Sequence, residues 1–120
     1  MEYKFEEIGD VLKVGLEGRL VAACSEEMRD RVSTRLEGVR KILFDLSGMT
    51  HIDSSGLGVL VQLLQRVTTS GGGLKLACLQ PHPRIVFDIT KVYRVFEIYD
   101  TVDAALASFA GTDTAATPAV

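Results

Sequence analysis

The sequence predicts one α/β domain with a mixed, mostly parallel sheet, an N-terminal β-hairpin and about four helices. Two stretches that alternate apolar and polar residues, 3–8 and 11–17, flank a Gly9-Asp10 turn, which is typical of a hairpin. After the hairpin, strand-like and helix-like segments alternate, which favours parallel strands joined by helices. The chain has 120 residues, of which 47% are hydrophobic, and this is enough for a single buried core.

The first helix is expected directly after the hairpin, where Ser25 is a suitable N-cap residue. Glu26 and Glu27 would then lie in the first turn, where the positive end of the helix dipole favours acidic side chains. Apolar residues recur at helical spacing until Gly38 ends the helix: Met28, Val32 and Leu36.

The remaining elements follow in alternation. The apolar run 42–46 predicts a strand covered on both faces, and a helix over 54–70 follows it and ends at three consecutive glycines. A strand over 74–79, a short helix from Pro83 to about Thr90, a strand over 95–99 and a final helix capped by Thr101 complete the order β-β-α-β-α-β-α-β-α. We expect a domain over 1–109 and a disordered tail over 110–120, where large apolar residues are scarce.

The composition argues against several classes of protein. The net charge is -3, which is unlike the basic footprint of a nucleic-acid-binding domain. No apolar run approaches the roughly 20 residues that span a bilayer, and the first residues lack the apolar core of a signal peptide. We therefore expect a cytoplasmic protein without membrane insertion. Cys24 and Cys78 are expected to be buried core residues, and neither forms a metal-ligand spacing with His51 or His82, so no metal and no cofactor are predicted.

The junction between the strand 42–46 and the following helix contains the most informative residues, His51-Ile52-Asp53-Ser54-Ser55-Gly56-Leu57-Gly58. Partners of parallel sheets tend to meet the carboxyl ends of strands, and a helix N-terminus favours negative charge. Gly56 and Gly58 would let another molecule approach the backbone closely. Two readings of the polar residues are open: Asp53 and Ser54 cap the helix, or a serine here carries a regulatory phosphate.

A helical projection of 54–70 separates a core face from an outer face. The outer face carries Ser55, Gln62 and Arg66, with Val59 among them and Leu63 on the flank. This predicts a partner surface formed by Val59, Leu63 and Arg66, although a single exposed apolar residue is also common without any function. The core face is expected to contain Leu57, Leu60, Val61, Leu64 and Val67.

Catalytic motifs are absent from the sequence. Ser54 is not surrounded by a G-x-S-x-G elbow, and the chain contains no G-x-x-x-x-G-K-[ST] phosphate loop. Asp45 lacks the acidic pair and the later Lys that a phosphate-accepting receiver domain would need, and is read as a strand-end carboxylate. The chain is therefore not predicted to be an enzyme.

The segment Asp53-Ser54-Ser55-Gly56-Leu57-Gly58, preceded by the strand 42–46, closely resembles the STAS domain family of anti-sigma-factor antagonists. The glycine-rich turn and strand 71–76, the segment 83–89 and the segment 95–99 extend the resemblance over about residues 3–109. The resemblance implies that Ser54 is phosphorylated by a partner that is both a serine kinase and an anti-sigma factor.

In that scheme the unphosphorylated protein captures the anti-sigma factor and frees a sigma factor, phosphorylation ends the capture, and a serine phosphatase restores it. ATP and Mg²⁺ would belong to the kinase. One departure is that Val21 stands where family members often have an Asp, with Arg19 beside it. The residues expected to bind the partner are Asp53, Ser55, Gly56, Leu57, Gly58, Val59, Leu63 and Arg66.

A competing function comes from other uses of this family. STAS domains also serve as small subunits of membrane transport assemblies, including lipid-moving ABC systems, and as parts of stress-sensing complexes. Because those proteins often lack the full switch serine, the intact Asp53-Ser54-Ser55-Gly56 segment favours the sigma pathway.

Overall fold

The sheet has the predicted order and directions. The computed structural model describes residues 1–111, which form five strands, four α-helices and one 3-10 helix. The strands lie in the order β1-β2-β3-β4-β5, with β1 antiparallel to β2 and all other neighbours parallel. Gly9, with φ +61°, makes the hairpin turn. The strands are β1 (Glu2–Ile8), β2 (Val11–Leu20), β3 (Lys41–Ile52), β4 (Gly73–Ala77) and β5 (Glu97–Tyr99).

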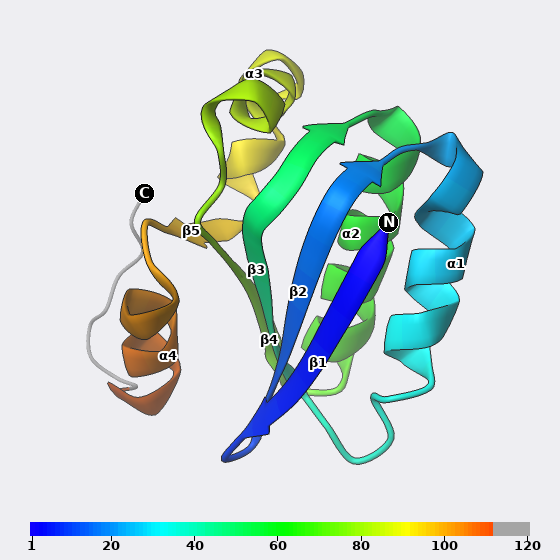
Figure 1. Cartoon of the computed structure of the whole chain (residues 1–120). Helices are drawn as coiled ribbons and strands as arrows, with labels where there is room; N and C mark the ends of the chain where they lie inside the picture. The colour runs from blue at the N-terminus through cyan, green and yellow to red at the C-terminus, as the bar shows by residue number, and fades with distance from the viewer. Residues whose placement is uncertain (112–120) are drawn as a thin grey trace.

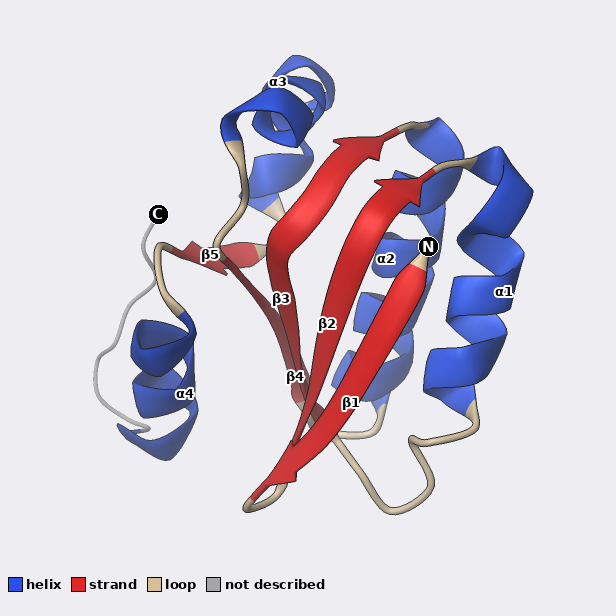
Figure 2. Ribbon diagram, in the orientation of Figure 1, coloured by secondary structure: helices blue, strands red, loops and turns tan. Residues whose placement is uncertain are grey.

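The helices form layers on the two faces of this sheet (Figure 1). Helices α1 and α2 cover one face, α4 lies on the other, and α3 stands beyond the carboxyl ends of β3 and β4 (Figure 2). The 3-10 helix η1 follows α3 and leads into β5. The bounds are α1 (Ala22–Ser33), α2 (Ser54–Thr69), α3 (Pro81–Thr90), η1 (Val92–Arg94) and α4 (Val102–Gly111).

The two layers bury two separate apolar clusters. The larger one lies between the sheet and the helices α1 and α2 and includes Leu16, Phe44 and Leu60. The smaller one lies under α4 and consists of Val11, Leu43, Ala77 and Ala105. Strands β2 and β3 contribute to both clusters because alternate residues of a strand point to opposite faces.

Several boundaries differ from the sequence prediction: α1 ends at Ser33, before Leu36, α3 begins at Pro81, and β5 begins only at Glu97, after the unpredicted η1. Three further differences concern the start of α1, the end of β3 and the end of α4. Helix α1 begins at Ala22, its N-cap is Val21 without a side-chain bond, and Ser25 is buried within the helix instead of capping it. Strand β3 continues to Ile52 because residues 48–52 pair with the end of β2, although their polar side chains hide the strand pattern. Helix α4 extends to Gly111, two residues into the expected tail, and the rest of that tail, 112–120, lies outside the described residues.

The cysteines also differ from the prediction, since both thiols are half-buried and not part of the core. The Cys24 Sγ donates to the Arg19 carbonyl at 3.1 Å, which holds it at the start of α1. Within residues 1–111, no helix has the length and apolar content needed to cross a membrane.

Candidate partner-binding site

Asp53 and Ser54 lie at the carboxyl end of β3, the central strand of the sheet. Asp53 is the N-cap of α2, and its Oδ1 accepts a hydrogen bond from the Gly56 N–H at 3.1 Å. This confirms the capping role that the sequence predicts for Asp53. Ser54 is the first residue of the helix and is exposed, so its hydroxyl is accessible at the positive end of the helix dipole.

The Asp53 carboxylate also caps the other helix on this face. Its Oδ2 accepts a hydrogen bond from the Ala22 N–H at 3.1 Å, and Ala22 is the first residue of α1. The Asp53 N–H donates to the Leu20 carbonyl at 3.3 Å, which fixes the backbone beside the end of β2. Because Val21 offers no capping side chain, α1 obtains its cap from Asp53, and the two helix N-termini meet at one carboxylate.

The two glycines after Ser55 have different surroundings. A Cβ added at Gly56 would lie 2.5 Å from the Leu20 carbonyl oxygen and 2.8 Å from the Leu20 Cγ, so this position is filled by the protein itself. A Cβ added at Gly58 would meet nothing within 4 Å, and Gly58 is exposed. Close approach by a partner at Gly58 therefore stays a prediction, whereas Gly56 serves the packing of α2 on β2.

The sequence prediction that Val59 and Leu63 face outward from α2 is wrong. Val59 and Leu63 are buried, with 6% and 1% of their surface exposed, and Leu57 is buried as well. The reason is that α2 packs against both the sheet and α1, so its buried stripe is wider than a projection against one neighbour suggests. Conversely, Val61 and Leu64, which were expected in the core, are only half-buried and line a hollow near η1.

A polar stripe remains on the exposed side of α2. It runs from Ser54 through Gly58 and Gln62 to Arg66, positions spaced four residues apart, so these residues follow one another along one side of the helix. Ser55 is exposed beside the start of this stripe. The accessible members of the predicted partner set are therefore Ser55, Gly58 and Arg66, together with the half-buried Asp53.

A hollow beside the site was not predicted from the sequence. It has a volume of about 510 Å³ and lies between the end of β3 and the start of α3. The rings of His51 and His82 contact each other edge to face there, with 4.8 Å between their centroids. Two isolated histidines give no motif, so only the fold reveals this pair. No group of three or more His, Cys, Asp and Glu residues in the described part of the chain is arranged to hold a metal ion.

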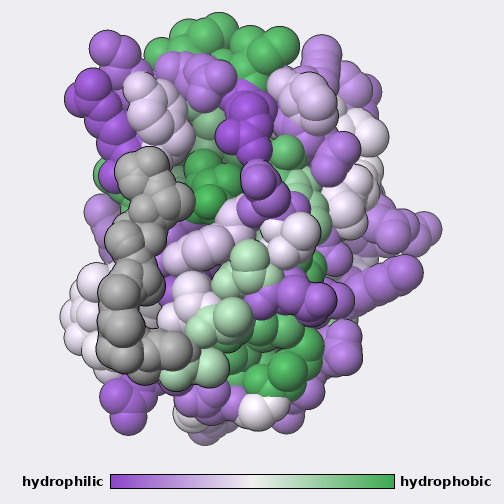
Figure 3. All heavy atoms as spheres, turned by 90° about the vertical axis from the view of Figure 1, so that its left-hand side faces the viewer, coloured by the Kyte–Doolittle hydropathy of each residue, from purple (hydrophilic) through white to green (hydrophobic). Residues whose placement is uncertain are grey.

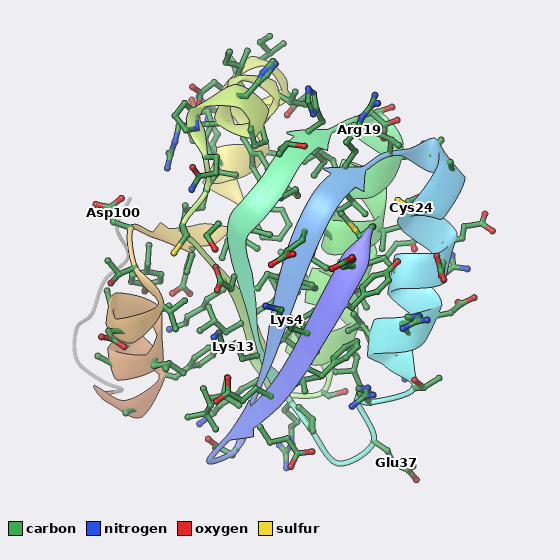
Figure 4. All side chains as sticks on the ribbon, viewed as in Figure 1. Lys4, Lys13, Arg19, Cys24, Glu37 and Asp100 are labelled. Carbon is green, nitrogen blue, oxygen red and sulfur yellow. The ribbon has the colours of Figure 1, made fainter. Side chains whose placement is uncertain are left out.

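Arg19 is a second residue whose position only the structure reveals. It lies near the end of β2, opposite His51 in the register with β3 (Figure 4). The guanidinium is exposed and forms no ion pair within residues 1–111. The carboxyl ends of β2 and β3, next to Ser54, therefore also present a cation.

Two proteins of known family are similar to this chain in sequence. BtrV of Bordetella bronchiseptica, named as an anti-sigma factor antagonist, is 28% identical over 110 residues, which cover 91% of this chain and 95% of BtrV. A protein of Thermotoga neapolitana with the same type of name is 40% identical over 77 residues, which cover 62% of this chain and 66% of that protein.

A crystal structure of an anti-sigma factor antagonist from Thermotoga maritima has the same fold. The TM-score is 0.84 at 25% sequence identity, and the match covers 90% of this chain and 94% of that one. The family model for the STAS domain matches residues 2–105, which include all five strands and the start of α4. The chain therefore belongs to the STAS domain family.

Proposed function

We propose that this chain is an anti-sigma-factor antagonist whose binding is switched off by phosphorylation of Ser54. The observation that carries the proposal is the exposed Ser54 hydroxyl at the first position of α2, directly after its capping Asp53. The names of the relatives support the same role. In this role the chain is a substrate and a binding module, and the kinase, which is also the anti-sigma factor, supplies ATP and Mg²⁺.

The polar stripe on α2 is the surface on which the partner docks. Gly58 lies one helical turn from Ser54 and has no atom within 4 Å of where a Cβ would stand, so the partner's backbone can approach there. Ser55, beside the start of the stripe, and Arg66, at its other end, supply hydrogen-bond donors. Asp53 acts mainly through positioning, because its two carboxylate oxygens already accept hydrogen bonds from Gly56 and Ala22.

Phosphorylation affects this interface more strongly than it affects the fold. A phosphate adds roughly -1.5 to -2 charges, and its repulsion from Asp53 across water is on the order of 1 kcal/mol. The helix N-terminus offsets about 0.3–1 kcal/mol of this repulsion. Burying the same dianion against a partner costs several kcal/mol unless a cation pairs with it. Binding is therefore lost while the folded structure stays intact.

The phosphorylation site is tested with the purified chain, the serine kinase that it binds and Mg-ATP. Mass spectrometry of wild type, Ser54→Ala and Ser55→Ala is expected to show phosphate on wild type and on Ser55→Ala only. The two serines are neighbours and both are exposed, so Ser55→Ala is a matched control. Phosphate on Ser55 in the Ser54→Ala protein would contradict the assignment.

The switch itself is tested by calorimetric titration of the anti-sigma partner with wild type, the phosphoprotein and Ser54→Asp. We expect the phosphoprotein to lose its affinity for the partner. Amide NMR spectra of the phosphoprotein and the unmodified protein should differ only at residues near 53–59. Shifts throughout the chain would indicate a refolding mechanism. Retention of the chain by a permease and not by an ATP-binding kinase would favour the transport alternative.

A further inference from the structure

The exposed large apolar side chains of this protein are concentrated in one segment. Within residues 1–111 they are Ile85, Ile89, Tyr93 and Val95, with 54%, 74%, 42% and 57% of their surface exposed. Ile85 and Ile89 are one helical turn apart, so both lie on the side of α3 that faces away from the buried Phe87. Figure 3 shows apolar atoms gathered over α3 at the top of the molecule. Such a concentration marks an interaction surface better than scattered apolar residues do.

A hollow adjoins the end of this segment. It has a volume of about 350 Å³ and is lined by Val61, Leu64 and Val95 together with the polar residues Gln65, Thr68 and Thr69. The hollow lies between α2 and the residue that follows η1, and Val95 belongs both to its wall and to the exposed apolar segment. An apolar side chain from a partner can therefore enter it as an anchor.

Two cations lie among these apolar residues. They are Lys91 and Arg94, which lie in the same segment. Neither of them forms an ion pair within the described chain, although the protein as a whole has a net charge of -3. Asp88 is the single carboxylate between residues 84 and 95. The surface is therefore apolar with a basic rim, and it is complementary to an acidic amphipathic partner.

We propose that residues 85–95 of α3 and η1, with the hollow lined by Val61 and Leu64, form a second docking surface for an acidic amphipathic helix of another protein. Its apolar residues lie over Ile89, Tyr93 and Val95, one of them enters the hollow, and its acidic residues pair with Lys91 and Arg94. Two copies of this chain meeting symmetrically here would oppose their own cations. A membrane would press the polar Gln65, Thr68 and Thr69 against acyl chains.

This surface lies farther along α2 than Ser54. Its hollow begins at Val61, seven residues after Ser54, and reaches Thr69, 15 residues after it, which is roughly 10–22 Å along the helix axis. The proposal goes beyond the anti-sigma-factor antagonist role and does not depend on it, because its test needs no kinase and no anti-sigma factor.

The test is a titration of the isotope-labelled protein with a synthetic amphipathic peptide of about four helical turns, carrying Leu on one face and Glu beside it. We expect amide shifts over 61–69 and 85–95 only, and no binding of a control peptide in which Lys replaces Glu. Val95→Asp and Arg94→Glu should each weaken binding at least tenfold, about 1.4 kcal/mol. Ala104→Asp, on an exposed part of α4, should leave the affinity unchanged.

Several outcomes would overturn the proposal. These are no shifts at millimolar peptide, equal binding of the Lys peptide, or shifts elsewhere on the protein. Co-sedimentation with vesicles of equal parts phosphatidylcholine and phosphatidylglycerol, lost in Val95→Asp, would assign the surface to a membrane. A dimer that Val95→Asp dissociates would assign it to a second copy. Because Val95 is exposed, a cooperative melt of Val95→Asp is expected and serves as the folding control.

Discussion

The carboxylate of Asp53 accepts a hydrogen bond from the backbone N–H of Ala22, which lies 31 positions earlier in the chain, at 3.1 Å. The same carboxylate accepts from the Gly56 N–H, so one side chain completes the first turns of two helices. Orphan N–H groups at a helix start are costly to leave unpaired when they are shielded from water. The residue before the proposed phosphorylation site therefore also anchors α1.

Replacing Asp53 should cost more stability than replacing an ordinary cap. A capping residue changed to Ala typically loses about 0.5–2 kcal/mol, so Asp53→Ala, which removes two caps, should lose roughly twice as much as a single-cap variant. Thr101→Ala is the matched control, because the Thr101 Oγ1 accepts only from the Ala104 N–H at the start of α4. Urea unfolding monitored by circular dichroism measures both. Equal losses would show that the bond to Ala22 contributes nothing.

The two glycines of the motif should respond in opposite directions to the same substitution. Gly56→Ala forces a methyl group to within 2.5 Å of the Leu20 carbonyl oxygen and should destabilise the fold by about 1–3 kcal/mol. Gly58→Ala meets no neighbour within 4 Å and should stabilise α2 by up to about 1 kcal/mol. Thermal melts of the two variants compare them directly. A stable Gly56→Ala protein would contradict the packing role.

Bulk at Gly58 should separate binding from folding. Gly58→Leu is expected to keep a cooperative melt, because the added side chain points into open space. It should lower the affinity for the anti-sigma partner by at least roughly tenfold if the partner approaches this stripe. Gln62→Ala, on the same stripe, serves as a milder comparison in the same titration. Unchanged affinity in Gly58→Leu would show that the partner does not contact α2 at Gly58.

A charge at Val59 should unfold the protein and not merely weaken binding. Val59 is 6% exposed in the core between α2, α1 and the sheet, so Val59→Asp buries an unpaired carboxylate. The expected loss of stability exceeds about 3 kcal/mol. Gln62→Asp introduces the same charge at an exposed position of the same helix and should change the stability by less than about 0.5 kcal/mol. A Val59→Asp protein that folds but no longer binds the partner would show that Val59 faces outward after all.

The Cys78 thiol should react slowly with alkylating reagents near neutral pH. Burial raises the pKa of Cys78, and the nearby Asp45 carboxylate raises it further. Since the thiolate is the reactive form, a raised pKa leaves less of it at pH 8 than in a free cysteine. In a Cys24→Ser protein, the alkylation rate should rise only at pH values above the usual pKa of a thiol. Asp45→Asn should shift this dependence of the rate on pH to lower pH. A rate equal to that of free cysteine would refute the shift.

Short-range patterns explain the parts of the fold that the sequence predicted correctly. Strict alternation on both sides of Gly9-Asp10 specified the hairpin, because side chains of a strand point to opposite faces in turn. The apolar run 42–46 specified a central strand. Residues 47–52 continue that strand through pairing with β2, and no periodicity of their own indicates it. The start of α1 was missed because its cap comes from Asp53 and not from a neighbouring residue.

The sequence by itself determined the order of strands and α-helices, the mixed sheet, the Asp53 cap on α2 and the location of Ser54 at the end of the central strand. These features depend on residue types within one turn or one strand. Only the tertiary structure decided which side of α2 is buried, that Gly56 serves internal packing, that Asp53 joins α1 to α2, and that η1 and α2 share a hollow. Each of these depends on a contact between distant segments, and the local pattern is the same whether or not that contact forms.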